Sequence, residues 1–157
     1  MAAGPKVTLA TLALGSCVAV AAFDRSTRVG GLLHVLLPDS ALDPEKARRS
    51  PGVFADTGLD LMWTQLRAAG ASLNRLEIQL AGGASMTGAP NYGDIGASNL
   101  AAVRRWLAAA GAQVVGEQVG GTDPKSVRLD LSTGRFWNCS PGKPPVTIGP
   151  ESQRSKL

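Results

Sequence analysis

The chain has 157 residues, of which 44% are hydrophobic and 18% are charged, a balance that favours one soluble globular domain and excludes a wholly disordered chain. Its two cysteines and single histidine exclude a disulfide scaffold and a histidine-rich metal site. The formal net charge is +4, but the basic residues form no continuous run and aromatic residues are few, so we expect no nucleic-acid binding.

The N-terminal part of the chain could be a membrane or targeting segment, or it could form strands of the fold. Residues 7–23 are uncharged and mostly apolar, yet the run is short for a membrane helix, which needs about 20 residues. A lipoprotein signal peptide, with Cys17 as the lipidated residue, is the alternative. We favour strands, because residues 18–23 continue as an apolar run where a tethered lipoprotein would have flexible polar residues. The sequence therefore predicts two strands, over residues 6–14 and 18–23.

The following segments alternate between strands and helices. After turn residues at 24–27, an apolar run predicts a third strand over residues 29–37, and the polar segment 41–52 predicts a loop or a short irregular helix. Asp56 is a candidate N-cap for a helix that ends near Ala69. Its apolar residues recur at helical spacing, at Leu59, Met62, Trp63 and Leu66.

The second half of the chain continues this alternation. We expect a second amphipathic helix at 99–110 and strands at 76–80, 113–119, 127–131 and 135–138. The segment from Gly82 to Gly96 reads as a long loop, and loops of that length are often functional. From Ser140 the chain is rich in proline and polar residues, and we expect it to fray.

These elements predict an α/β fold. The expected strands are almost continuously apolar, as in a sheet that is covered on both faces. We therefore expect a compact single-domain layered sandwich of mixed or antiparallel β-sheet with helices packed outside. The domain is expected to span residues 1–139, and residues 140–157 to form a polar tail. None of the glycine pairs has the spacing of a phosphate-binding loop, so no nucleotide site is indicated.

The position of the single histidine is the main functional indication. If Asp24 pairs with Thr27 across a two-residue turn, Cys17 lies directly opposite His34 in a hairpin, and a slip of one residue would put them on opposite faces. A thiol beside an imidazole can act as a nucleophile, because the histidine lowers the thiol pKa and carries its proton. The structural alternative is a pair of buried side chains that only pack.

These residues also carry a resemblance to a known family. The run from Thr11 to Val18, followed by Gly30-Gly31-Leu32-Leu33-His34 and Leu37-Pro38, resembles the CheD family, the chemoreceptor glutamine deamidases of bacterial chemotaxis. The likeness continues through Gly82-Gly83-Ala84, the Ile95-Gly96-x-x-Asn99 motif and Gly120-Gly121. It covers about residues 6–137, most of the chain.

The resemblance implies a function and an active site. It implies a cysteine-dependent amidohydrolase that converts glutamine side chains of methyl-accepting chemotaxis receptors to glutamate, with methylester hydrolysis also attributed to the family. Cys17 would be the nucleophile, His34 the general base and acid, and Thr11 the residue that orients His34. Without the resemblance, Thr8 is an equal candidate for that last role. No metal or organic cofactor is expected.

Further residues and partners follow from the same resemblance. Gly15 and Ser16 would support an oxyanion through their backbone, and Gly82, Gly83 and Asn99 are candidates for the substrate pocket. Expected partners are the receptors and the phosphatase CheC, with the protein in the cytoplasm, peripheral to receptor arrays and not inserted in the membrane. The alternative function is a non-catalytic adaptor that docks on receptors or CheC.

The chain departs from the family at two places. Thr122-Asp123-Pro124-Lys125 stands where family members usually carry Gly-Arg, which puts in doubt the contact that this arginine makes. The tail beyond Asn138 has no counterpart, and its final Ser155-Lys156-Leu157 would be a peroxisomal signal only in a eukaryote.

Overall fold

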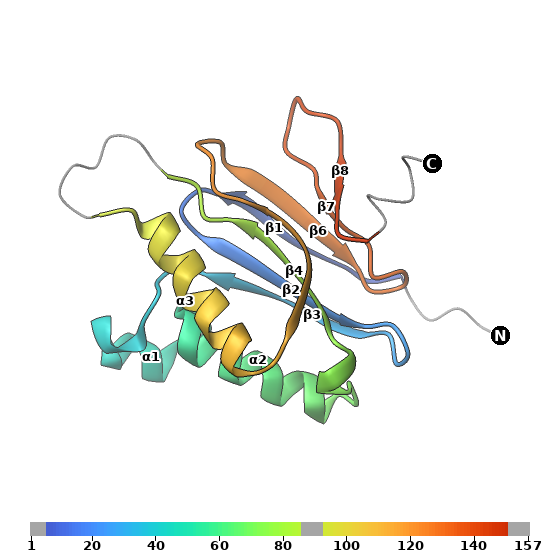
Figure 1. Cartoon of the computed structure of the whole chain (residues 1–157), viewed down its shortest axis with the longest axis horizontal. Coiled ribbons are helices and arrows are strands. Elements are labelled where there is room, and N and C mark those ends of the chain that lie inside the picture. The colour runs from blue at the N-terminus through green and yellow to red at the C-terminus, as the bar shows by residue number, and fades with distance from the viewer. Residues whose placement is uncertain (1–5, 86–92, 151–157) are drawn as a thin grey trace.

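Two four-stranded sheets lie face to face in this computed structural model, which describes residues 6–85 and 93–150 (Figure 1). Sheet A is antiparallel, with the strand order β1-β6-β7-β8, and sheet B has the order β3-β2-β4-β5, in which β4 and β5 are parallel. The strand bounds are Thr8–Leu14 (β1), Val18–Asp24 (β2), Val29–Val35 (β3), Glu77–Gly82 (β4), Gln113–Val119 (β5), Lys125–Asp130 (β6), Phe136–Asn138 (β7) and Val146–Ile148 (β8).

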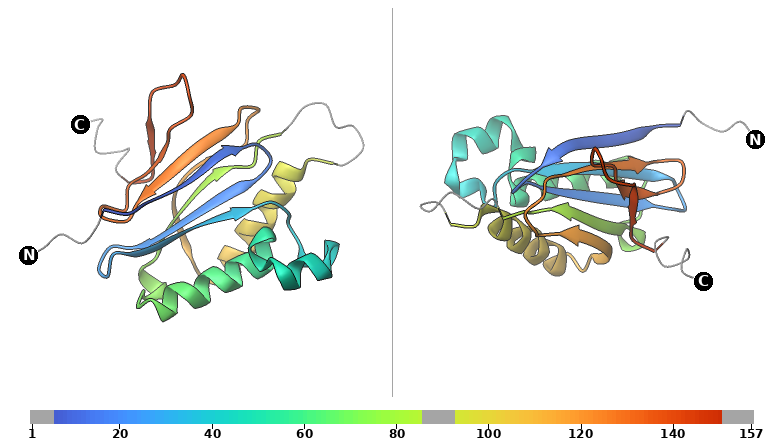
Figure 2. Two further views of the ribbon diagram at one scale, coloured as in Figure 1. Left: turned by 180° about the vertical axis from the view of Figure 1, so that it is seen from behind. Right: turned by 90° about the horizontal axis from the view of Figure 1, so that it is seen from above.

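The helices form a third layer. Pro44–Arg49 (α1), Ala55–Ala68 (α2) and Ile95–Ala109 (α3) lie on the sheet B side, and α2 and α3 cover the outer face of that sheet (Figure 2). Among the described residues, no helix covers the outer face of sheet A (Figure 1). This arrangement confirms the predicted α/β sandwich of mixed and antiparallel sheets with helices outside.

Strand β2 divides the core in two. Every residue of β2 is buried, and successive side chains point to opposite faces of sheet B. Val18 and Val20 pack under the helices, whereas Ala19 and Ala21 pack between the sheets. This double burial explains why the strand reads as an uninterrupted apolar run.

The predicted register of the β2–β3 hairpin is wrong by two residues. Asp24 pairs with Val29 across a four-residue turn, so His34 lies opposite Ala19 rather than Cys17. The turn is longer because the Arg28 N–H donates to the Asp24 carbonyl at 2.8 Å, with Arg28 at φ 58°. A shift of two preserves the direction of every side chain, so Cys17 and His34 still belong to the same face, as diagonal neighbours.

Both long helices begin before their predicted starts. The Asp56 carboxylate is not the N-cap of α2, because it lies in the first turn and accepts hydrogen bonds from the backbone and hydroxyl of Ser40. Helix α3 begins at Ile95, four residues before its expected start, because the Asp94 carboxylate accepts from the Ala97 N–H. The polar segment 41–52 contains α1, which agrees with the predicted short irregular helix.

The apolar run near the N-terminus belongs to the sandwich. The apolar N-terminal run forms β1 and β2, so cleavage before Cys17 would remove the edge strand of sheet A. No helix within residues 6–85 and 93–150 has the length and apolar character needed to cross a membrane. Residues 86–92 of the predicted long loop and residues 151–157 of the tail lie outside the described residues.

The expectation that the chain frays from Ser140 is wrong for residues 140–150. Strand β8 pairs with β7, and the buried Gln79 side chain donates to the Ile148 carbonyl at 2.6 Å, which joins sheet B to sheet A. Gly149 has φ 109°, and a Cβ there would overlap the Gln79 side-chain nitrogen.

We predict that Gly149→Ala destabilises the protein more than Gly142→Ala. Both residues have positive φ, so each alanine incurs a backbone cost of about 1 kcal/mol, but only Gly149 adjoins a side chain that links the sheets. Urea denaturation of the two variants measures the difference in the free energy of unfolding. Equal losses would contradict the role assigned to Gly149.

Candidate active site

A hydrogen bond joins the edge strands of the two sheets. Thr11 lies on β1 and His34 on β3, and Thr11 Oγ1 is 2.9 Å from His34 Nδ1. Thr11 shares the inner face of β1 with Leu9, which packs against the core between the sheets. Thr8 is on the opposite, exposed face of that strand, so the structure brings Thr11 and not Thr8 to the histidine.

The second ring nitrogen of His34, Nε2, is buried and makes no hydrogen bond to the described residues. Burial lowers the pKa of His34 below its usual value, because the imidazolium form is poorly solvated there. The imidazole is therefore neutral near pH 7, with one nitrogen bonded to Thr11 and the other unused.

Cys17 lies in the segment that crosses from sheet A to sheet B, between β1 and β2. Its side chain is partly buried and packs against the core between the sheets. Burial raises the pKa of the Cys17 thiol above its usual value, and the backbone N–H of the same residue offsets part of that rise. Burial therefore dominates the Cys17 pKa in the free protein, and the lowering expected from His34 is not among the causes of the net shift.

Hydrogen bonds from the segment after β4 fix the backbone of residues 15–17. The Gly83 N–H donates to the Cys17 carbonyl at 2.7 Å, and the Ala84 N–H donates to the Gly15 carbonyl at 2.9 Å. Gly82 has φ 97°, and a Cβ at that position would overlap the Cys17 carbonyl oxygen. The glycine pair predicted from sequence thus allows β4 to approach the segment that carries Cys17.

Asn99 supports the same segment from α3. Its side chain is fully buried, and Nδ2 donates to the carbonyls of Ser16 and Leu36, each at 3.0 Å. Gly82, Gly83 and Asn99 thus all contact the backbone around Cys17. Contact of these three residues with substrate stays a prediction.

The segment that departs from the family pattern lies at the same end of the sandwich. The Gly120 N–H donates to the Gly82 carbonyl at 2.9 Å, and Lys125 Nζ donates to the Gly120 carbonyl at 3.1 Å. Lys125 is also opposite Leu14 in the β1–β6 ladder. A lysine, held by backbone carbonyls, therefore supplies positive charge near the site.

Sequence reasoning missed Ser126. Its hydroxyl accepts a hydrogen bond from the Ala13 N–H at 3.1 Å, at an irregularity in the β1–β6 ladder where Ala13 has φ 54°. This irregularity lies between Thr11, which is still in register with Val127, and the segment that carries Cys17. No local signal could have revealed it, because alanine rarely adopts positive φ and the serine is 113 residues away along the chain.

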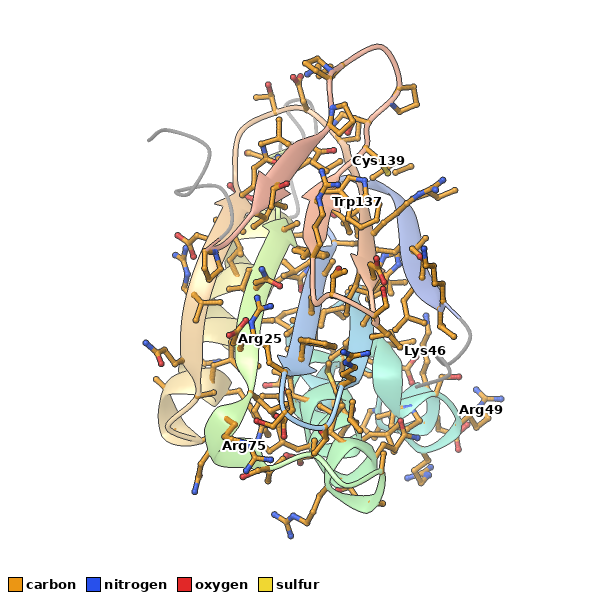
Figure 3. All side chains as sticks on the ribbon, turned by 90° about the vertical axis from the view of Figure 1, so that its right-hand side faces the viewer. Arg25, Lys46, Arg49, Arg75, Trp137 and Cys139 are labelled. Atoms are coloured by element: carbon orange, nitrogen blue, oxygen red, sulfur yellow. The ribbon has the colours of Figure 1, made fainter. Side chains whose placement is uncertain are left out.

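The second cysteine lies elsewhere. Cys139 follows β7 on the outer side of sheet A, at the opposite end of the molecule from Arg75 (Figure 3). It lines a surface depression of about 610 Å³ together with Leu12 and Arg128. One thiol is therefore packed against the core between the sheets, and the other borders an open face.

Comparison with known proteins identifies close relatives. The family described as CheD chemotactic sensory transduction matches residues 36–139. The chain is 44% identical over 139 residues to the probable chemoreceptor glutamine deamidase CheD of Solibacter usitatus, covering 88% of this chain and 82% of that protein. It is 40% identical over 128 residues to the chemoreceptor glutamine deamidase CheD of Thermotoga maritima, covering 82% of this chain and 78% of that protein.

We predict that alkylation of Cys17 by iodoacetamide is slow at pH 7 and rises with a midpoint above the usual thiol pKa of about 8.5. A raised pKa keeps the thiol protonated to higher pH, and only the thiolate reacts. Mass spectrometry of the Cys17 peptide in a Cys139→Ser variant gives the rate of this thiol alone. A midpoint below pH 8 would show that a positive charge, not burial, dominates at Cys17.

Proposed function

The chain belongs to the CheD family, and we propose that it is a chemoreceptor glutamine deamidase in which Cys17 is the nucleophile. The names of the relatives supply the reaction, which is conversion of receptor glutamine side chains to glutamate. The observation that carries the mechanism is the Thr11–His34 hydrogen bond, which leaves a buried, unpaired nitrogen on the face that also carries Cys17.

The proposed reaction proceeds through a thioester. His34 Nε2 takes the proton of the Cys17 thiol as the sulfur attacks the side-chain carbonyl carbon of a glutamine. The tetrahedral intermediate collapses when His34 returns that proton to the nitrogen, and ammonia leaves. His34 then takes a proton from water, which attacks the thioester, and returns that proton to the sulfur as glutamate and the free thiol are released.

Thr11 is proposed to select the tautomer of the neutral histidine. If its hydroxyl oxygen accepts a hydrogen bond from Nδ1–H, the lone pair of the neutral ring lies on Nε2, where it can receive the thiol proton. Thr11 itself transfers no proton, because its hydroxyl has no acidity near pH 7.

The oxyanion is proposed to bind to backbone N–H groups of the segment 15–17. The carbonyls of Gly15 and Ser16 accept hydrogen bonds from Ala84 and Asn99, inside the protein. In a planar trans peptide the N–H points away from the carbonyl, so the N–H groups of Ser16 and Cys17 face away from these donors. This direction supports the oxyanion role assigned to this segment.

The proposal includes the location of the protein and its partners. Because receptor glutamines are its proposed substrates, we propose that the protein acts in the cytoplasm beside receptor arrays, and the family resemblance implies CheC as a docking partner. A non-catalytic adaptor is not favoured, because it would not require Cys17, His34 and Thr11 to be arranged as they are.

We predict that Cys17→Ala abolishes deamidation of a receptor signalling fragment without a large loss of stability. The variant removes the only proposed nucleophile and deletes one partly buried atom. Mass spectrometry detects the reaction as a gain of about 1 Da at each glutamine converted to glutamate. Cys139→Ala is the matched control and should retain activity. Equal loss of activity in both variants would contradict the assignment.

We predict that Thr11→Val lowers kcat about tenfold, as expected for the loss of one neutral hydrogen bond together with the preferred tautomer. Valine keeps the shape and the strand propensity of threonine, so folding should be unaffected. Thr8→Val, on the opposite face of β1, should leave kcat unchanged. Full activity in Thr11→Val would remove the hydroxyl from the mechanism.

A further inference from the structure

We propose that Asn99 is a positioning residue, which fixes the separation of Cys17 and His34 by holding the two chain segments that carry them. The inference rests on the proposed function, since it concerns the geometry of the same nucleophile and base. It assigns Asn99 a different task from lining a substrate pocket, because its amide nitrogen already bonds to the protein backbone.

The two hydrogen bonds of Asn99 reach both halves of the site. Nδ2 donates to the carbonyl of Ser16, the residue directly before Cys17. It also donates to the carbonyl of Leu36, just beyond the end of β3 and two residues after His34. A single nitrogen therefore connects the segment that carries the nucleophile to the end of the strand that carries the base.

Stability alone does not explain an asparagine here. The side chain is fully buried, and its Oδ1 atom has no hydrogen-bond partner among the described residues. A buried acceptor without a partner destabilises a fold, whereas an apolar side chain of similar volume would not bring one. The polar benefit of Asn99 thus lies in the two bonds that Nδ2 donates near the site.

The helix that carries Asn99 is itself fixed against the site. A Cβ at Gly96 would overlap the carbonyl oxygen of Ala84, so α3 packs directly on the backbone after β4. That backbone donates through Gly83 and Ala84 to the carbonyls of Cys17 and Gly15. Asn99 is therefore anchored on a rigid support, which is what a residue that sets a separation requires.

Two substitutions separate the hydrogen bonds from packing. Asn99→Leu keeps a similar volume without donors, and Asn99→Asp keeps the shape but, when ionised, presents an acceptor to two carbonyl oxygens. Val103→Ala, one turn along α3 and fully buried, is the control for a helix that is weakened without loss of a bond to the site. The experiment is done well below the melting temperature of each variant.

The proposal predicts a change in kcat and a change in the alkylation rate of Cys17 in the same variant. For Asn99→Leu, kcat for receptor deamidation should fall about 10- to 30-fold, with KM little changed, because two neutral hydrogen bonds that position the reacting groups are lost. In the same variant, iodoacetamide should alkylate Cys17 faster at pH 7.5. The midpoint of the pH profile of alkylation should move down toward that of an exposed thiol. Asn99→Asp should show both effects if it folds.

The outcomes are decisive in each direction. Lower kcat with faster alkylation in Asn99→Leu, and neither change in Val103→Ala, supports the proposal. An Asn99→Leu variant that matches Val103→Ala in kcat and in the alkylation midpoint would reduce Asn99 to a structural residue. Alkylation needs no receptor, so it still tests Asn99 if the wild-type protein fails to deamidate, which would contradict the proposed function instead.

Discussion

The hydrogen bond between Thr11 and His34 spans the open edge of the sandwich, and the candidate site depends on it. It can form only because β1 and β3 are both edge strands and because the two sheets stack so that these edges coincide. Small residues such as Ala19 and Ala21 fill the space between the sheets near this edge. The packing of the core thus sets the distance over which threonine and histidine meet.

Burial gives this site its resting state. Removal of water disfavours the charged form of each partner, which raises the pKa of Cys17 and lowers that of His34. The pair is therefore a neutral thiol and a neutral imidazole in the free protein. In the proposed mechanism, charge separates only when the substrate carbonyl arrives, and the backbone N–H groups of residues 15–17 would stabilise the anion then formed.

Much of this architecture could be predicted from the sequence, because apolar runs and helical spacing are local properties. The hairpin register was wrong by an even number of residues, so Cys17 and His34 kept their common face even though Asp24 has a different partner. The β7–β8 pairing was missed because Ile148 lies in a segment of turn-like composition and is stabilised by Gln79, which is distant in sequence. The bulge at Ala13 could not be predicted, because a serine in β6 stabilises a backbone conformation that alanine disfavours.

The pairing of β1 with β6 has a consequence for biosynthesis. Strand β1 precedes Cys17, yet β6, its neighbour in sheet A, lies far along the chain and ends at Asp130. A ribosome adds residues one at a time, so β1 has no partner in its sheet until most of the chain has emerged. Thr11, Cys17 and His34 are therefore translated before β6 but acquire their arrangement only after it has emerged. A nascent or truncated chain that lacks β6 carries the Cys17 thiol without the geometry on which the proposed mechanism depends.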